Sequence, residues 1–432
     1  MLVIAYKQQL RQVHKRIYRC FTSKSTTLQN KDPKNRSEEP EPAYDRVTKN
    51  AEETIVYSRH PFQCQYGAIL PELHLAYEAW GKLNDAKDNV VLLQHGLSAN
   101  PHARSNLVLK DSSPGWWEKF IGPGLSLDTN KFFVICVNLL GSCYGSTGPS
   151  SINPITGKPY GGDFPIVSIG DMVHSQFLLL NMLGIHKVHA VVGASLGGLA
   201  AFSSAKQYPQ SIDRIVSISA AGNSAPSAIA FRYLQRVALM MDPKWNNGHY
   251  YETGIPFDGT RLARKIATLT YRSGPEWDER FKTMKVDDSD NSLPRYRSTE
   301  FLIEDYIRHQ GESFIKRTKY DPNSIIYLSK AMDIFDIGEN HGSMAEGFAQ
   351  IKCPTLVMGA SSDILYPVSK QKDAARYIAQ GGNKNVEFYI NDGHFGHDTF
   401  LLDVDGMGKE MKEICYLKIK KYLIELEKSF WA

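Results

Sequence analysis

Several features that would point to a specialised class of protein are missing from this sequence. No apolar run approaches the roughly 20 residues that a membrane-spanning helix needs. The six cysteines are widely scattered and form no Cys-x-x-Cys pair, so we expect reduced thiols rather than a disulfide framework or a zinc site. A net charge of +4 over 432 residues gives little support to nucleic-acid binding. We therefore expect no metal, nucleic acid or membrane among the partners of this chain.

Acidic side chains are absent from the first thirty residues, and Asp32 is the first carboxylate. This segment carries six lysines and arginines, several serines and threonines, and apolar residues at helical spacing. Such a composition is typical of a mitochondrial transit peptide. The alternative is a disordered basic tail on a cytoplasmic protein. Residues 31–50 are charged and contain proline, as linkers do, so we predict a leader and linker over residues 1–50.

Short apolar runs alternate with helical patterns from about residue 52 onward. Runs of this kind suit a parallel sheet that is covered on both faces by helices. We predict a doubly wound α/β domain over residues 51–221 and 346–432, with functional residues at the carboxyl ends of the strands. The predicted strands lie in "HLAYEAWG", "NVVLLQHG", "KFFVICVNLLG", "KVHAVVGAS", "DRIVSISAA", "CPTLVMGAS" and "NVEFYINDGH".

Residues 222–345 interrupt this alternation. Their longer apolar periodicities are helical and separate the fifth strand of the sheet from the sixth. We predict a helical lid inserted into the α/β domain, with a mobile loop at "KVDDSDNSLPRYRS". The predicted lid helices lie in "AFRYLQRVALMM", "TRLARKIATLTYRS", "STEFLIEDYIRHQGESFIKR" and "SIIYLSKAMDIF".

A single hydroxyl, Ser195, stands in the small and apolar stretch "VVGASLGGLAA". Gly193 and Gly197 flank it, which completes a Gly-x-Ser-x-Gly motif between a predicted strand and a predicted helix. This motif is the signature of a nucleophile elbow, a turn so sharp that only small residues fit beside the serine. The motif alone is also compatible with an incidental serine in a glycine-rich turn, so its interpretation depends on the partners of Ser195.

Two later strand ends offer those partners. Asp363 follows one predicted strand, and both His394 and His397 follow the next. The order Ser, Asp, His is the order of an α/β-hydrolase triad, in which the imidazole takes the serine proton and the carboxylate holds the imidazole. We predict that Ser195, Asp363 and one of the two histidines form a catalytic triad.

A nucleophilic serine also requires donors for the oxyanion. The amide of Leu196, which follows the serine, is one donor, and the turn after "VVLLQ" offers the amide of Leu97 as the second. His95 in the same turn is expected to be structural. The predicted oxyanion hole therefore consists of the Leu97 and Leu196 N–H groups.

Several stretches together resemble the homoserine/serine O-acyltransferases of α/β-hydrolase fold. The resemblance runs from about residue 55 to near the C-terminus, and the long Gly/Ser/Pro-rich loop over residues 141–165 makes it more specific than the serine motif. The stretches are "QHGLSANPHA", "WWEKFIGPGLSLDTNKFFVICVNLLGSCYGSTGPSSINPITGKPYGGDFP", "VVGASLGG", "RLARKIATLTYRS" and "GHDTFLLD".

The resemblance implies a donor, a reaction scheme and further site residues. It implies acyl-CoA as co-substrate, ping-pong chemistry through an acyl group on Ser195, and no bound cofactor. The histidine of the "GHDTFL" motif is the catalytic one, which selects His397 over His394. Asp398 would face the ammonium group of the acceptor amino acid, and Arg236 would bind its carboxylate. The resemblance also suggests a homodimer formed through the lid helices.

Differences from the homoserine-acetylating pattern bear on the acceptor and on the acyl group. Ala194 and Leu196 replace the Gly and Met of the homoserine-acetylating pattern, and residues 97–100 read Leu-Ser-Ala-Asn in place of Leu-Thr-Gly-Asn. This combination favours L-serine, for cysteine synthesis, over L-homoserine, for methionine synthesis. We expect acetyl rather than succinyl transfer because no additional basic residue lies in the motif loops. An esterase that uses the same triad is the remaining alternative.

Overall fold

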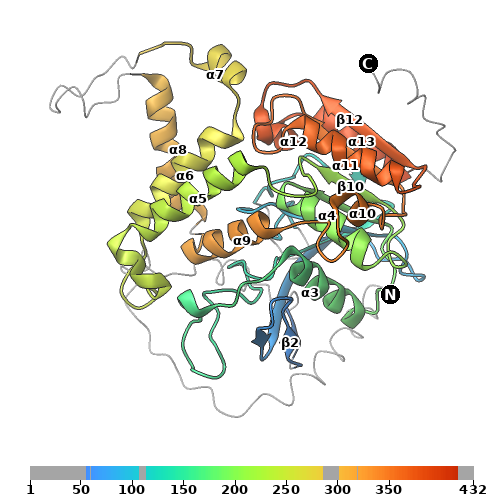
Figure 1. Cartoon of the computed structure of the whole chain (residues 1–432), viewed down its shortest axis with the longest axis horizontal. Helices are drawn as coiled ribbons and strands as arrows, with labels where there is room; N and C mark the ends of the chain where they lie inside the picture. Colours follow the sequence, from blue (N-terminus) through green and yellow to red (C-terminus); the bar gives the residue numbers. More distant parts are fainter. Residues whose placement is uncertain (1–54, 59, 107–112, 286–300, 319, 417–432) are drawn as a thin grey trace. The chain divides into compact units, whose positions relative to one another are not determined.

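The computed structural model describes residues 55–58, 60–106, 113–285, 301–318 and 320–416 (Figure 1). The predicted leader and linker, residues 1–50, lie outside the described residues. The predicted mobile loop also falls outside them, except for its first residue. None of the helices in the described ranges is long and apolar enough to cross a membrane.

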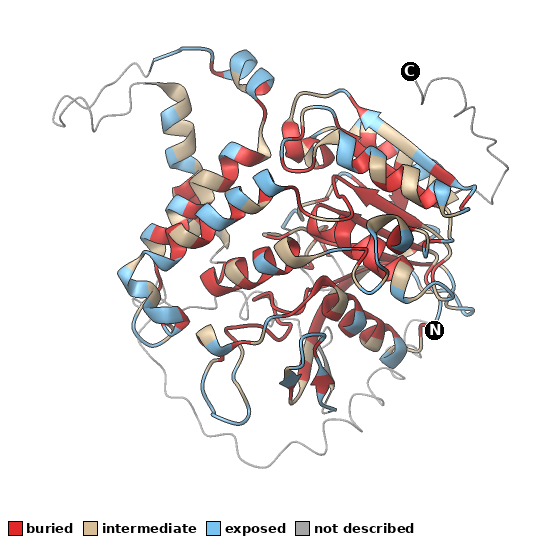
Figure 2. Cartoon of the chain, in the orientation of Figure 1, coloured by how far each residue is buried: buried red, intermediate tan, exposed pale blue. Residues whose placement is uncertain are grey.

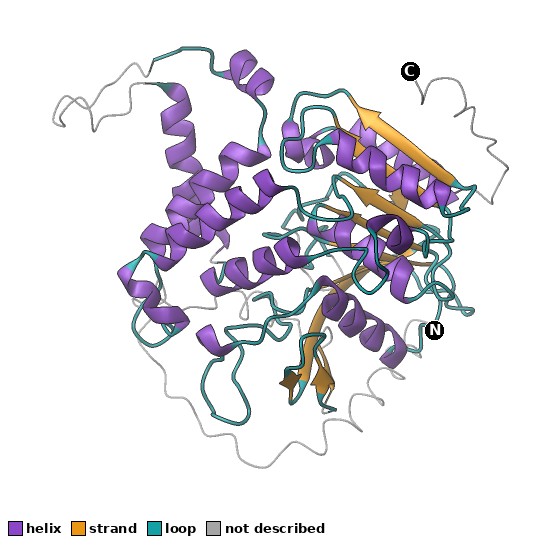
Figure 3. Cartoon of the chain, in the orientation of Figure 1, coloured by secondary structure: helices purple, strands orange, loops and turns teal. Residues whose placement is uncertain are grey.

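An eight-stranded sheet forms the centre of the described chain (Figure 3). Its strand order is β1-β4-β8-β5-β9-β10-β11-β12, with β4 antiparallel to β1 and to β8 and every other pairing parallel. All seven predicted strands are present, so the predicted α/β-hydrolase fold with a mostly parallel sheet is confirmed. The strands are β1 (Ile55–Ser58), β4 (Leu73–Trp80), β5 (Val90–Gln94), β8 (Phe133–Val137), β9 (Ala190–Ala194), β10 (Ile215–Ile218), β11 (Thr355–Ala360) and β12 (Val386–Asn391).

Two apolar clusters, one on each face of the sheet, explain the continuous apolar runs. Leu92 of β5 belongs to the cluster that includes α3 and α4, whereas its neighbours Val91 and Leu93 belong to the cluster that includes α13. Because successive strand residues point to opposite faces, a strand buried on both faces needs apolar residues throughout. Figure 2 shows these strands buried along most of their length. The covering helices are α3 (Ile169–Met182), α4 (Leu196–Gln207), α11 (Val368–Gln380) and α13 (Val404–Tyr416).

A group of helices follows β10 and precedes β11, in the segment that was predicted to form a lid. Within it α5, α6 and α8 lie side by side, and α9 packs against α5 (Figure 1). The helices are α5 (Pro226–Met240), α6 (Phe257–Tyr271), α7 (Gly274–Arg280), α8 (Leu302–Thr318), α9 (Pro322–Ile334) and α10 (Met344–Phe348). The described residues also form two small two-stranded sheets that were not predicted. One pairs β2 (Phe62–Gln63) with β3 (Ile69–Leu70), and the other pairs β6 (Ile121–Gly122) with β7 (Leu127–Asp128).

Candidate active site

Ser195 occupies a strained turn between β9 and α4. Its backbone has φ 57° and ψ −120°, a conformation that residues with a Cβ rarely adopt. A Cβ on Gly193 would collide with the Gly197 carbonyl, and a Cβ on Gly197 would collide with the Gln94 carbonyl of β5. Close backbone approach therefore explains both glycines of the motif, and the turn holds the serine at the carboxyl edge of the sheet.

His397 and Asp363 form a buried hydrogen-bonded pair. His397 Nδ1 lies 2.7 Å from Asp363 Oδ2, and the side chains are 4% and 0% exposed. The other carboxylate oxygen of Asp363 accepts the backbone N–H groups of Leu365 and Tyr366 at 2.8 and 3.0 Å. A carboxylate fixed in this way favours a proton on Nδ1 and leaves Nε2 free to act as a base.

Three aromatic rings surround the His397 imidazole. The centroids of Tyr366, Phe400 and Tyr271 lie 5.7, 5.6 and 6.1 Å from that of the imidazole. Burial alone would lower the pKa of His397, but the negative charge of Asp363, with a smaller contribution from Asp398, raises it above its ordinary value. The histidine is therefore desolvated and still held as a strong base.

His394 differs from His397 in its exposure and in its charged partner. Its side chain is 44% exposed, and Nε2 pairs with Glu279 Oε2 at 3.0 Å. The geometry brings Asp363 together with His397 and leaves His394 at the surface. Ser195 Oγ itself makes no hydrogen bond to any described residue.

The two predicted oxyanion donors are the backbone N–H groups of Leu97 and Leu196. Neither Leu97 nor Leu196 donates its amide to another described residue. The Leu97 turn is held by the lid, because Tyr320 donates its hydroxyl to the Leu97 carbonyl at 2.6 Å.

His95 is fully buried and accepts Leu139 N–H at 3.2 Å on Nε2, and burial lowers its pKa to about 4. His95 is thus a neutral structural residue, as expected.

Arg236, which was predicted to bind the acceptor carboxylate, is paired with residues of the chain itself. Its guanidinium donates to Asp333 Oδ2 at 2.6 Å and to Ser329 Oγ at 3.1 Å, both on α9. The side chain is buried, so this ion pair is poorly accessible to an incoming carboxylate. These contacts indicate that Arg236 joins α5 to α9 within the lid.

Arg264 on α6 belongs to the motif "RLARKIATLTYRS" and was not among the predicted site residues. No hydrogen bond or ion pair joins its guanidinium to any described residue, and its Nε is buried. The guanidinium lies 4.9 Å from the Phe314 ring and 5.4 Å from the Tyr271 ring. Its charge also stabilises the Asp398 carboxylate, whose pKa is raised chiefly by burial and which pairs with Arg272 at 3.1 Å. An unpaired guanidinium therefore lies near the half-buried Asp398 carboxylate, which follows the catalytic imidazole in the chain.

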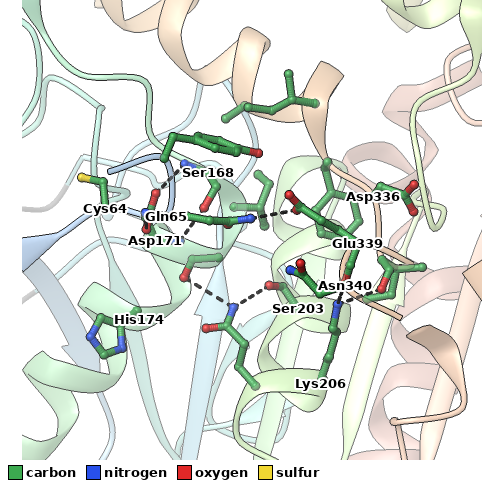
Figure 4. A pocket seen from close by; sticks show the side chains of 18 of the residues that line it. Cys64, Gln65, Ser168, Asp171, His174, Ser203, Lys206, Asp336, Glu339 and Asn340 are labelled. Atoms are coloured by element: carbon green, nitrogen blue, oxygen red, sulfur yellow. Dashed lines mark hydrogen bonds between the residues drawn. The ribbon is translucent and has the colours of Figure 1, made fainter. Parts of the chain in front are cut away.

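A cavity of about 510 Å³ lies elsewhere, between α3, α4 and the segment after α9 (Figure 4). None of the predicted site residues lines it. Polar groups that line it are hydrogen-bonded within the chain: Lys206 donates to the backbone carbonyls of Ile337 and Glu339 at 2.9 and 3.1 Å, and Gln65 donates to the Glu339 carboxylate at 2.8 Å. This cavity marks the junction at which the chain returns from the lid to the sheet.

The described residues contain no group of three or more His, Cys, Asp or Glu side chains that could hold a metal ion. The predicted chemistry of the site is that of an activated serine, for which the triad and two amides are sufficient.

The fold and the serine elbow define an enzyme of the α/β-hydrolase class. A family model described as alpha/beta hydrolase fold matches residues 89–412. Among curated proteins, the chain is 42% identical to the serine O-succinyltransferase of Emericella nidulans, over 87% of this chain and 82% of that protein. It is also 42% identical to the homoserine O-acetyltransferase of Moorella thermoacetica, over 78% of this chain and 88% of that protein.

Solved structures agree with these relatives. The homoserine O-acetyltransferase of Bacillus anthracis is 25% identical, with a TM-score of 0.76 over 85% of this chain and 100% of that one. Esterase E22 is 30% identical, with a TM-score of 0.75 over 84% and 98% of the two chains. The chain belongs to the homoserine/serine O-acyltransferase family of α/β-hydrolases, as the motifs indicated, and is an O-acyltransferase.

Proposed function

We propose that this chain transfers an acyl group from an acyl-CoA to the side-chain hydroxyl of L-serine, through an acyl group carried on Ser195. The observation that carries the proposal is the buried His397–Asp363 pair at the same sheet edge as the strained serine. His397 Nε2 takes the hydroxyl proton as Ser195 Oγ attacks the thioester carbonyl carbon. The Leu97 and Leu196 amides stabilise the oxyanion, the C–S bond breaks, and CoA leaves as the thiol with the proton from His397.

The second half-reaction repeats these steps with the amino acid. His397 takes the proton of the acceptor hydroxyl, whose oxygen attacks the acyl carbon, and Ser195 leaves with that proton. We propose that Arg264, rather than Arg236, binds the acceptor carboxylate, because its guanidinium is unpaired. The Asp398 carboxylate binds the ammonium group. An unpaired guanidinium matches a carboxylate bidentately.

The acceptor assignment rests on the relatives and on the motif differences. The fungal relative is named for serine and succinyl transfer, whereas an equally similar bacterial relative is named for homoserine and acetyl transfer. Homoserine is therefore the second candidate acceptor. The two acceptors differ by one methylene, which is worth about 10- to 200-fold in kcat/KM, so a clear preference is measurable.

One experiment tests the chemistry and the acceptor together. Brief exposure of the full chain to acyl-CoA, followed by digestion and mass spectrometry, should place the acyl group on the peptide that contains Ser195. Turnover is then measured with L-serine and L-homoserine, each with acetyl-CoA and succinyl-CoA. An acyl group on another peptide would overturn the nucleophile, and acyl-CoA hydrolysis unaffected by either amino acid would make the chain a hydrolase.

A matched pair of variants tests the acceptor site. Arg264→Lys should raise the KM for the amino acid about tenfold or more, while the rate of Ser195 acylation stays near that of the wild type. Arg236→Lys is the control and should leave the acceptor KM unchanged. The opposite outcome would return the carboxylate-binding role to Arg236.

We further propose a mitochondrial location, supported by the acid-poor, basic composition of the first thirty residues.

We also propose a homodimer formed through the lid helices. It is supported by exposed apolar side chains on α5 and α6, including Tyr233, Leu234, Leu262 and Leu269.

A further inference from the structure

Asp398, the residue proposed to bind the acceptor ammonium group, uses only one of its carboxylate oxygens within the described chain. It occupies the N-cap position of α12 (Thr399–Leu402), where an aspartate ordinarily accepts backbone N–H groups of the helix, but its side chain makes no such hydrogen bond. Its Oδ2 lies 3.1 Å from Arg272 Nε instead. Its Oδ1 interacts with no described residue. The carboxylate is therefore turned toward Arg272 and keeps one oxygen available for a ligand.

Arg272, which directly follows α6, is held on its other side by a second carboxylate. Its Nη1 donates to Glu276 Oε1 at 3.1 Å, and the Glu276 side chain is 6% exposed. The backbone N–H of Glu276 donates to Ser273 Oγ at 3.2 Å, and the Ser273 hydroxyl donates to the His394 carbonyl. A Cβ on Gly396 would lie 2.7 Å from the Arg272 carbonyl carbon. The guanidinium is thus fixed by its own turn and by the loop between β12 and α12.

The charges around Asp398 oppose one another. Burial raises the pKa of Asp398, and the negative charge of Glu276 adds to that rise. The positive charges of Arg272, protonated His397 and Arg264 lower the pKa, Arg272 by the most, but it stays above its ordinary value. An ammonium group pairs with the ionised carboxylate and not with the neutral acid. Loss of Arg272 would therefore raise the pKa of Asp398 further and weaken ammonium binding as the pH falls.

We propose that Arg272 is a positioning residue for the acceptor amino acid: it holds Asp398 Oδ2 and thereby presents Oδ1 to the ammonium group. This inference rests on the proposed function, in which Asp398 binds that group, and deepens it with a residue that acts without touching the substrate. Arg272 is not itself a ligand for the acceptor carboxylate, because its Nε and Nη1 are already used by two carboxylates. Arg264 keeps that role, since no described carboxylate pairs with it.

The test separates the two half-reactions in the full chain. The first release of CoA, from whichever of acetyl-CoA and succinyl-CoA acylates wild type faster, reports acylation of Ser195 and needs no acceptor. Steady-state rates with varied L-serine and L-homoserine give the acceptor KM. Arg272→Gln should raise that KM about tenfold or more, the range expected for hydrogen bonds to a charged group. The acylation rate should change by less than about threefold.

Arg280→Gln is the matched control. Arg280 lies at the outer end of the same series of charges, 3.6 Å from Glu276 Oε1, and its side chain is 48% exposed. This variant removes one positive charge from the series without removing a contact to Asp398. The acceptor KM should therefore stay at its wild-type value.

The pH dependence provides a measurement that a general loss of structure would not reproduce. Both half-reactions use His397, but only the second uses Asp398, so the pH profile of acylation is the reference. In Arg272→Gln the rise of kcat/KM for the amino acid should move to higher pH by more than the acylation profile does. Arg272→Lys keeps the charge but loses the planar guanidinium that reaches both carboxylates. Its profile should stay near that of wild type, with the acceptor KM raised several-fold.

A double-mutant cycle tests whether Arg272 acts through Asp398. Asp398→Asn should by itself raise the acceptor KM while acylation of Ser195 continues. In the Asp398→Asn background Arg272→Gln should add little, because the carboxylate that it positions is no longer present.

The outcomes distinguish this inference from the proposed function. The positioning role is overturned by an unchanged acceptor KM in Arg272→Gln, by equal losses in both half-reactions, or by the same rise in KM with and without the Asp398 carboxylate. If Arg272→Gln does not fold, Arg272→Lys decides, and a wild-type KM in that variant overturns the role. A wild-type acceptor KM in Asp398→Asn would overturn the proposed acceptor site together with this inference. Absence of an acyl group on Ser195 in the wild type would overturn the proposed function itself.

Discussion

The strain at Ser195 makes a quantitative prediction about stability. Any residue with a Cβ at φ 57° and ψ −120° keeps that strain, whereas glycine adopts the conformation freely. Ser195→Ala and Ser195→Gly both remove the nucleophile, so both should be inactive in acyl transfer. They should nevertheless differ in stability, with Ser195→Gly the more stable of the two.

The expected difference follows from two opposing contributions. A residue held in such a sparsely populated region costs about 1–3 kcal/mol. Glycine gains more conformational entropy on unfolding, which offsets about 0.5–1 kcal/mol of that gain. Ser195 Oγ makes no hydrogen bond to a described residue, so Ser195→Ala should unfold with nearly the wild-type free energy. Ser195→Gly should therefore exceed Ser195→Ala by about 1 kcal/mol.

Urea unfolding followed by tryptophan fluorescence measures this difference. The two variants should share the same dependence on denaturant, so that a shift in midpoint reports stability alone. A Ser195→Gly variant equal to or less stable than Ser195→Ala, at equal slope, would refute the argument that this turn is strained by its side chain.

Three further predictions concern the relay and the leader. Asp363→Asn should lower kcat by about 10⁴-fold and move the rising limb of kcat/KM to lower pH, because the charge that raises the pKa of His397 is removed while burial still lowers that pKa; a limb that stays or rises would contradict the relay. His397→Ala should abolish acylation of Ser195, whereas His394→Ala, at an exposed position, should lose less than about tenfold; the reverse order would exchange their roles. Residues 1–35 fused to a fluorescent reporter should direct it to mitochondria, and diffuse fluorescence would reject the targeting role.

The sheet and its catalytic edge could be predicted because their signals are local. Strands buried on both faces leave continuous apolar runs, and the elbow leaves glycines on both sides of Ser195. The order of Ser195, Asp363 and the two histidines at successive strand ends then limits the candidate triads to two. The short strands β2, β3, β6 and β7 were not predicted, since two residues carry no periodicity.

The roles of the lid arginines could not be predicted in the same way. Arg232, Arg236 and Arg264 all lie on amphipathic helices, where each has the pattern of a solvated or paired cation. Which of them is left unpaired depends on Asp333, which follows Arg236 by nearly a hundred residues and reaches it only through the packing of α9 on α5. A contact of this kind is set by tertiary structure, so the resemblance alone pointed to Arg236, whereas the proposal of Arg264 depends on contacts that only the structure shows.

The fold that carries the catalytic triad is shared by enzymes of different activity, and this has a consequence for specificity. Esterase E22 and the homoserine O-acetyltransferase of Bacillus anthracis share this fold at nearly equal TM-scores, so the scaffold alone does not distinguish hydrolysis from transfer. In the proposed scheme the difference lies in what reaches the acyl group on Ser195 once CoA has left. Charged side chains of α6 and of the segment after β12 hold the amino acid with its hydroxyl near His397, and this raises its effective concentration far above that of a free solute. Water has no charges for Arg264 and Asp398 to bind, so removal of either charge should raise the fraction of acyl groups lost to hydrolysis while acylation continues.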